Sequence, residues 1–176
     1  YNDLDKLEDF IKLYEETMDN ANANKDFYFK KEYYLDLFAK LNGKIYLANM
    51  VLDDKIYSSV LFFASGDFIQ LYLSGRNLQF KKVPSFVPLY INIAKWAKLN
   101  KFKTLNLGGG RTNSEDDTLF KFKKRLSNDF MDFYIGKRIH NEKIYQELKS
   151  DYIINNGTDK YNEVKNQLQF YQSNNF

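Results

Sequence analysis

The sequence predicts an α+β fold, in which a central, mostly antiparallel mixed sheet is flanked by helices and followed by extra C-terminal helices. Apolar stripes of helical period come first. Strand-like segments joined by tight polar turns follow, and a further helix then leads into one more strand. A meander, a helix and a strand that returns beside the meander give a layered sandwich of sheet and helices.

Two helices are expected before the sheet. Residues 3–19 place apolar side chains at helical spacing, with acids near the start. Residues 31–41 repeat this pattern and end at Asn42-Gly43, a pair typical of a helix C-terminus. Residues 20–26 show no periodicity and predict a loop, after which residues 27–29 are expected to be extended.

The antiparallel part of the sheet is predicted from strands at 44–52, 55–64 and 68–74, which short polar turns separate. The second of these strands is apolar on both faces, so we expect it to be central. Residues 75–84 then form a long loop, and long loops in compact domains are often functional.

Ser85 is expected to cap a third helix, which tolerates Pro88 in its first turn and ends at Asn100 in a left-handed conformation. A strand at 102–107 follows. Farther along, we predict a last strand at 130–135. The final helices are predicted at 141–149 and 158–171. No linker is evident, so the sequence predicts a single domain over residues 1–176.

Composition excludes several classes of protein. Of 176 residues, 44% are hydrophobic and 18% aromatic, so the chain can bury a core and is not disordered. A net charge of +3 does not by itself indicate nucleic-acid binding. With no cysteine and one histidine, a cysteine-based zinc site and a Cys–His nucleophile are excluded. The lack of cysteine fits a reducing cytoplasm, and without a long apolar run or a signal peptide we expect a cytoplasmic protein with no transmembrane segment. We also expect no metal and no cofactor.

The most informative stretch runs from Leu105 to Leu126. A strand ends in three consecutive glycines, and a polar loop then leads to the start of a helix. This layout lets the backbone approach a ligand closely and directs amide N–H groups toward negative charge. In the helix, Lys123 lies between an apolar stripe and Phe120. A lysine inside an apolar arc either extends along it to reach solvent or acts in a cleft.

The order and spacing of several motifs resemble the GNAT acyltransferases, and more narrowly their Fem-type (FemABX) branch. The segments that carry the likeness cover residues from about 8 to 148. They are Phe10 to Met18, Phe27-Tyr-Phe29, Tyr72-Leu-Ser-Gly75, Ala94-Lys-Trp-Ala97, Leu107-Gly-Gly-Gly110, Asp117 to Lys123, and Ile135 to Ile139 with Asn141 and Tyr145.

The resemblance implies an aminoacyltransferase of peptidoglycan or cell-envelope synthesis. Its donor would be aminoacyl-tRNA or another acyl donor, and its acceptor an amine on a cell-wall precursor. Fem-type enzymes usually have two tandem GNAT domains, and this chain resembles the second. We therefore expect a preceding GNAT-like domain, so that the chain is the C-terminal half of a longer protein.

One departure from the wider superfamily bears on the donor. GNAT enzymes that use coenzyme A carry a glycine-containing phosphate loop before the helix that here starts near Ser85. Residues 83–88 contain no glycine, which removes the usual amide cradle for a diphosphate. This favours the Fem-type branch. An acyl-CoA-dependent enzyme of the same fold, and a non-catalytic module that binds RNA or a partner, are the alternatives.

The candidate catalytic residues are Lys123 and Asp117. Lys123 could stabilise phosphate or the oxyanion that forms when an acyl ester is attacked, and the alternative is a lysine at the edge of the helix that reaches solvent. Asp117, or its neighbour Asp116, could be the general base for the amine, although helix capping explains either acid equally well. The candidate substrate-binding residues are Tyr72, Ser74, Gly108, Gly109, Gly110, Arg111 and Phe120.

Overall fold

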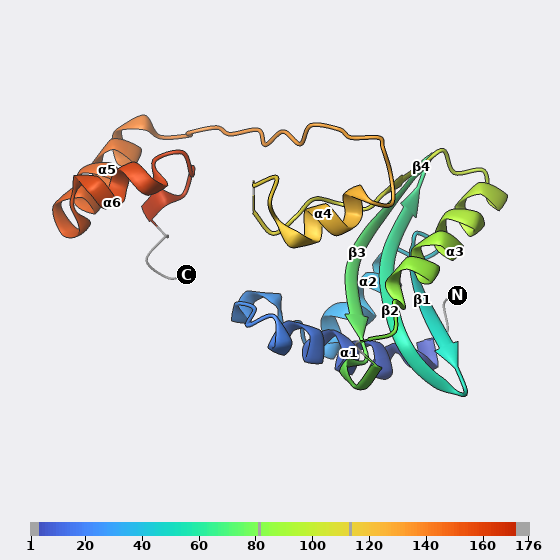
Figure 1. Cartoon of the computed structure of the whole chain (residues 1–176). Helices are drawn as coiled ribbons and strands as arrows, with labels where there is room; N and C mark the ends of the chain where they lie inside the picture. The colour runs from blue at the N-terminus through green and yellow to red at the C-terminus, as the bar shows by residue number, and fades with distance from the viewer. Residues whose placement is uncertain (1–3, 81, 113, 172–176) are drawn as a thin grey trace. The chain divides into compact units, whose positions relative to one another are not determined.

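The computed structural model describes residues 4–80, 82–112 and 114–171. The chain divides into two compact units, Tyr1–Asn128 and Asp129–Phe176, and each is described by itself (Figure 1). None of the described helices is long and apolar enough to cross a membrane.

The first unit begins with two helices, as predicted. A short 3-10 turn, Leu4–Lys6, precedes α1 (Leu7–Asn20). A second short turn, Lys25–Phe27, leads into α2 (Lys31–Lys40). Both helices are amphipathic, and their apolar sides contribute to one buried cluster.

The sheet contains β1 (Ile45–Leu52), β2 (Lys55–Ser65), β3 (Phe68–Arg76) and β4 (Thr104–Asn106), in that order. The first three strands form an antiparallel meander, and β4 pairs with β3 in parallel. The prediction of a mostly antiparallel mixed sheet with a central second strand is therefore confirmed.

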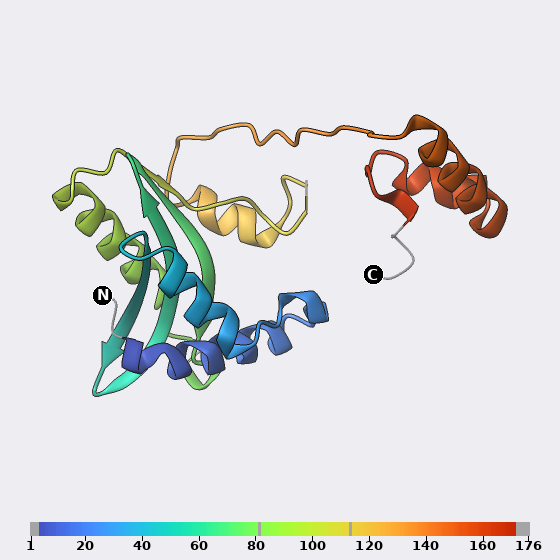
Figure 2. The same cartoon turned by 180° about the vertical axis from the view of Figure 1, so that it is seen from behind.

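Helices cover both faces of the sheet, and each face has its own core. α1 and α2 pack on one face, where Phe10, Tyr34 and Leu61 are fully buried. α3 (Phe86–Leu99) packs on the other face with Phe62 and Ile93. The opposite views in Figures 1 and 2 show α1 and α2 on one side of the sheet and α3 on the other.

The contact between α1 and β3 is a close approach of two backbones. A Cβ atom at Gly75 would lie 2.5 Å from the backbone nitrogen of Tyr14. The backbone N–H of Arg76 also donates to the hydroxyl of Thr17 at 2.9 Å. Only glycine leaves room for α1 at this point of β3.

An irregularity in β3 redirects its side chains. The register with β2 shifts between Leu61 and Phe62, so that Tyr72 is an extra residue in β3. Leu71 packs in the core under α3, whereas Leu73 packs in the core under α1 and α2. The bulge therefore decides which face each residue of β3 reaches.

The pairing of β3 with β4 is short. It joins Phe68–Gln70 to Thr104–Asn106 and extends no farther along either strand. Within the described residues, β3 from Leu71 onward has a strand partner on the β2 side only. The two parallel strands thus separate at Gln70, which leaves an open backbone edge.

Three local predictions differ from the structure around α3 and β4. The predicted strand at 102–107 is shortened to Thr104–Asn106. The left-handed residue after α3 is Lys101, with a φ of 64°, because Asn100 continues the last helical turn at −91°. Ser85 does precede α3, but its side chain makes no capping hydrogen bond.

The second unit contains α5 (Glu142–Asn156) and α6 (Thr158–Val164). Phe170 is fully buried and contacts the rings of Tyr145, Tyr152 and Tyr161. Two C-terminal helices are present as predicted, but their ends differ: α5 continues beyond the predicted end at residue 149 to Asn156, and α6 ends at Val164, after which the described residues 165–171 form turns.

The predicted last strand at 130–135 is wrong. These residues form no strand, and the side chains of Phe133 and Tyr134 are 87% and 83% exposed. The alternation of side chains at 130–135 indicates a preference for extended backbone. A strand also needs a neighbouring strand to complete its backbone hydrogen bonds. No such neighbour pairs with this segment in the described part of the chain.

Candidate functional site

The candidate site is built on the turn that follows β4. The side chain of Asn106 accepts a hydrogen bond from the N–H of Gly108 at 2.8 Å, and Gly108 has a φ of +73°. This contact forms a side-chain turn at the point where the strand ends. Gly109 and Gly110 then lead toward the start of α4 (Thr118–Lys124).

Asp117 connects α4 to residues 108–110, which we call the glycine turn. One carboxylate oxygen accepts from the N–H groups of Leu119 and Phe120, both at 2.9 Å, and so caps the helix. The other oxygen accepts from the N–H of Arg111 at 2.9 Å and from the N–H and hydroxyl of Thr112 at 3.1 and 3.3 Å. Of the two roles considered for Asp117, general base and helix cap, the bonds from Leu119 and Phe120 show the helix cap.

Two further observations define the chemistry of Asp117. The N–H of Phe120 has the largest effect and lowers the pKa of the carboxyl; burial opposes it, and the N–H groups of Arg111, Thr112 and Leu119 lower the pKa further, so that it lies below its ordinary value. A Cβ atom at Gly110 would lie 2.6 Å from the same carboxylate, so the turn needs glycine there. A carboxylate with a lowered pKa is a weak base.

Lys123 points back onto the glycine turn. Its Nζ donates to the carbonyl oxygen of Gly109 at 2.8 Å, and a Cβ atom at Gly108 would lie 3.4 Å from the same nitrogen. Burial lowers the pKa of this lysine, and the negative charge of Asp117 partly offsets that effect. The ammonium group is therefore held against the turn and partly removed from water.

Packing of α4 fixes the direction of Lys123. Phe122 and Leu126 pack against the core under α3, and the ring of Phe122 lies 6.2 Å from that of Tyr90. Within α4, the ammonium of Lys124 lies 5.9 Å from the centre of the Phe120 ring. Phe122 and Leu126 anchor α4 on this core, and the position of Lys123 follows from the packing of the helix.

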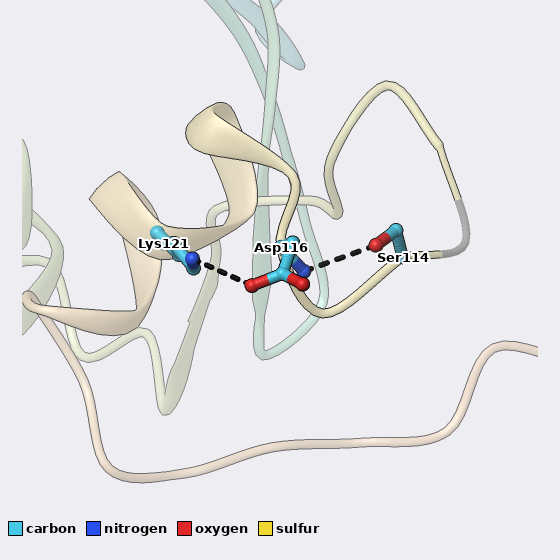
Figure 3. A network of polar contacts seen from close by, with 3 residues as sticks. All are labelled: Ser114, Asp116 and Lys121. Atoms are coloured by element: carbon cyan, nitrogen blue, oxygen red, sulfur yellow. Dashed lines mark hydrogen bonds and ion pairs between the residues drawn. The ribbon is translucent and has the colours of Figure 1, made fainter.

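Asp116, the other candidate base, is engaged within the loop. Its carboxylate pairs with the ammonium of Lys121 at 2.7 Å, and its backbone N–H donates to the hydroxyl of Ser114 at 3.1 Å (Figure 3). Both partners are local, so these contacts order the loop before α4.

Tyr72 and Ser74 lie on opposite faces of β3. The hydroxyl of Tyr72 is 2.6 Å from that of Tyr33 in α2, and its ring packs 4.9 Å from that of Phe63. The hydroxyl of Ser74 is 3.4 Å from that of Tyr90 in α3. The structure thus gathers the other candidate residues at the glycine turn and α4, while the two on β3 face different helices.

Several residues of this region were not predicted from the sequence. Gln70, the last residue of β3 paired with β4, places its side-chain nitrogen 3.8 Å from the Cβ position of Gly108. Asn106 stands two residues before a glycine, a side-chain turn signal that could have been recognised. Tyr33 and Tyr90 reach β3 from separate helices, and no sequence pattern marks them.

The start of α3 offers few amide donors. Pro84 and Pro88 have no N–H, and the N–H groups of Val83 and Ser85 already donate to the carbonyls of Phe80 and Val83. Among residues 83–88, a diphosphate would find only the N–H groups of Phe86 and Val87 before the hydrogen bonds within the helix begin at Leu89.

No metal site is visible in the described ranges, where no group of three or more His, Asp or Glu side chains is arranged to hold an ion.

Comparison with solved structures identifies the fold. The chain is similar to the aminoglycoside acetyltransferase meta-AAC0020 from an uncultured soil metagenomic sample, solved in complex with sisomicin. The TM-score is 0.56 at 16% identity, over 78% of this chain and 91% of that one. It is also similar to PaiA N-acetyltransferase from Thermoplasma acidophilum in complex with coenzyme A. There the TM-score is 0.52 at 15% identity, over 70% and 82% of the two chains.

The chain therefore has the α+β GNAT-like fold that the sequence predicted. At these identities the likeness concerns the fold alone. No protein-family model matches the chain, and no curated protein matches it in sequence. The narrower Fem-type resemblance stays a prediction.

Proposed function

We propose that the chain is an N-acyltransferase that moves an acyl or aminoacyl group from an activated donor to an amine. The observation that carries this proposal is the ammonium of Lys123, which is held 2.8 Å from the carbonyl of Gly109 in the glycine turn. The turn lies beside Gln70, where β3 and β4 separate. A fixed, partly desolvated cation is suited to stabilise negative charge that develops during a reaction.

In the proposed reaction, the amine nitrogen attacks the acyl carbon and a carbon–nitrogen bond forms. The bond from the acyl carbon to the leaving oxygen or sulfur breaks, and the leaving group departs with that electron pair. The amine loses one proton, and the leaving group gains one. Lys123 would stabilise the oxyanion of the tetrahedral intermediate, and the glycine turn would admit the donor closely. Asp117 would hold the turn through its hydrogen bonds. It would not act as the general base, because a carboxylate with a lowered pKa is a weak base.

For the donor we propose aminoacyl-tRNA, with a cell-wall precursor as the acceptor and a preceding GNAT-like domain completing the cytoplasmic enzyme. The proline-containing start of α3 supports a donor other than coenzyme A, because it offers few free amides for a diphosphate. The second candidate is an acyl-CoA-dependent enzyme, which is favoured by the similarity to PaiA in complex with coenzyme A.

The test of Lys123 is acyl transfer by the Lys123→Met variant. Loss of a group that stabilises the oxyanion is expected to lower kcat about a hundredfold or more. Lys121→Met is the matched control, since Lys121 lies on the same helix but pairs with Asp116 at the surface. Equal rates for the parent and Lys123→Met would rule out the proposed role of Lys123.

The donor is tested by offering aminoacyl-tRNA and acetyl-CoA to the same preparation. Transfer from aminoacyl-tRNA alone supports the first candidate, and transfer from acetyl-CoA supports the second. Salt-sensitive binding of tRNA without transfer from either donor would instead indicate a module that binds RNA.

A further inference from the structure

A cavity in the second unit is lined by two lysines and has no part in the proposed reaction. Its volume is about 420 Å³, within the range of roughly 300–1,000 Å³ that is usual for small-molecule sites. The residues that line it are Lys137, Tyr145, Lys165, Asn166, Gln167 and Leu168. They come from the segment before α5, from α5 itself and from the turn after α6. We call this the lysine cavity.

Two hydrogen bonds connect the three segments around the lysine cavity. The ammonium of Lys137 donates to the carbonyl oxygen of Asn166 at 2.5 Å, and the hydroxyl of Tyr145 donates to that of Leu168 at 3.1 Å. The ring of Tyr145 also packs against that of Phe170, which is fully buried, with the centroids 5.4 Å apart. The walls of the cavity are therefore attached to the core of the second unit.

The charge that lines the lysine cavity is positive. Of the ion pairs in the described ranges, none includes Lys137 or Lys165. The ammonium of Lys165 lies 3.4 Å from the side-chain oxygen of Asn162, which is as neutral as the carbonyl that Lys137 contacts. No acid of the described chain lines the cavity, and Glu142 at the start of α5 accepts instead from the side chain of Gln146. Two cations thus line one cavity without a counter-charge.

We propose that the lysine cavity binds the phosphate group of a small phosphate ester. A phosphate monoester carries a charge of about −1.5 to −2 at neutral pH, so it can neutralise both ammonium groups at once. An ammonium also has several N–H donors, and those that Lys137 and Lys165 do not use on neutral acceptors can reach phosphate oxygens.

The size and the walls of the lysine cavity favour an ester over a free phosphate ion. Tyr145 and Leu168 offer apolar surface beside the two lysines. An organic group attached to the phosphate would cover this surface, and its removal from water is favourable. This inference goes beyond the proposed acyl transfer, because Lys123 and the glycine turn belong to the first unit.

The binding test is a calorimetric titration of the full chain with adenosine monophosphate (AMP), inorganic phosphate and adenosine at low ionic strength. AMP is expected to bind at least about threefold more tightly than inorganic phosphate, because it also buries apolar surface. Adenosine lacks the phosphate and is expected not to bind. Lys137→Met and Lys165→Met are each expected to weaken AMP binding at least about fivefold, because each removes a charge-assisted contact.

Lys143→Met is the matched control, since it removes the same charge from the same unit at a residue that does not line the cavity. Its affinity for AMP is expected to match that of the parent. Lys137→Arg keeps the positive charge and is expected to retain most of the affinity. Lys165 is exposed and makes one long contact, so Lys165→Met is expected to keep the Tm of the parent. Loss of binding is thereby separated from loss of fold.

Two results would overturn the phosphate site: no AMP binding by the parent, or the same affinity in Lys143→Met as in the two cavity variants. Equal affinities of the parent for AMP and inorganic phosphate would overturn the preference for an ester. Because the titration contains no acyl donor, its outcome is independent of whether the chain transfers acyl groups.

Discussion

At the residue scale, Asp117 organises the candidate site. Its two carboxylate oxygens accept hydrogen bonds from both sides of the loop, at Arg111 and Thr112 on one side and at Leu119 and Phe120 on the other. Only the ionised form accepts at every one of these positions, since a protonated carboxyl gives up one acceptor for a donor. The lowered pKa of Asp117 reflects this requirement.

The first prediction concerns the pH dependence of stability at Asp117. Because the folded pKa lies below the ordinary value of 3.8, the ionised group stabilises the fold above that value, and this stabilisation is lost as the pH falls through the folded pKa. The Tm of Asp117→Asn is therefore expected to be lower than that of the parent at neutral pH, with the gap closing in acid. Thermal melts of both proteins from neutral to acidic pH measure it.

Asp116→Asn is the matched control, since Asp116 makes one surface ion pair and donates through its backbone. Its Tm is expected to stay close to that of the parent across the same range. A Tm gap for Asp117→Asn that persists unchanged into acid would contradict the account of Asp117 as an ionised cap.

The candidate residues also show what sequence alone can and cannot predict about a site. Helical periodicity predicted that Lys123 lies between the apolar stripe and Phe120, but its contact with the carbonyl of Gly109 became visible only in the structure. The pairs Tyr33–Tyr72 and Ser74–Tyr90 join residues far apart in the chain. They depend on a bulge and on the docking of two helices, and neither is encoded in a local pattern.

At the element scale, the meander was predictable because its turns are local. Asp53 and Asp54 adopt left-handed dihedrals, with φ of 49° and 57°, and Gly66 does so at 58°. Aspartate and glycine residues that adopt left-handed dihedrals form tight hairpin turns, and these turns depend little on distant parts of the chain. The predicted strand at 130–135 was wrong because strand formation depends on a partner, which the alternation of side chains cannot supply.

The second prediction concerns the contact between α1 and β3. Gly75→Ala would place a methyl group 2.5 Å from a backbone nitrogen of Tyr14, and backbone cannot move aside as a flexible side chain can. The variant is expected to be destabilised by about 1–3 kcal/mol, which lowers Tm by roughly 2–12 °C for a chain of this size. Thermal or urea unfolding measures the change.

Gly136→Ala is the control for this substitution, because a Cβ atom there meets nothing within 4 Å and its φ is not left-handed. Its stability is expected to match that of the parent. Should Gly75→Ala unfold at the parent temperature, α1 and β3 would have to be farther apart than described.

At the scale of the whole molecule, the two compact units differ in the secondary structure that each contains. The first holds the sheet and both of its cores, and the second is a small helical unit around Phe170. Residues 129–140, at the start of the second unit, form no helix or strand. Segments without helix or strand hydrogen bonds are where proteases cut first.

The third prediction is therefore a pattern of limited proteolysis. Chymotrypsin is expected to cut first at Phe133 and Tyr134, which are exposed, and to spare the buried rings of Phe10, Tyr34 and Phe62. A stable fragment that ends at one of the two exposed residues, identified by mass spectrometry, supports this division. Early cleavage within the first unit would contradict it.

Gly75 also bears on the order in which the fold assembles. The two hairpins of the meander close over short stretches of chain, whereas α1 meets β3 across 59 residues, the separation of Thr17 from Arg76. Loop-closure entropy delays contacts between distant residues until nearer ones have formed. We therefore expect α1 to be among the last elements of this unit to dock, and Gly75→Ala to speed unfolding while leaving the refolding rate nearly unchanged.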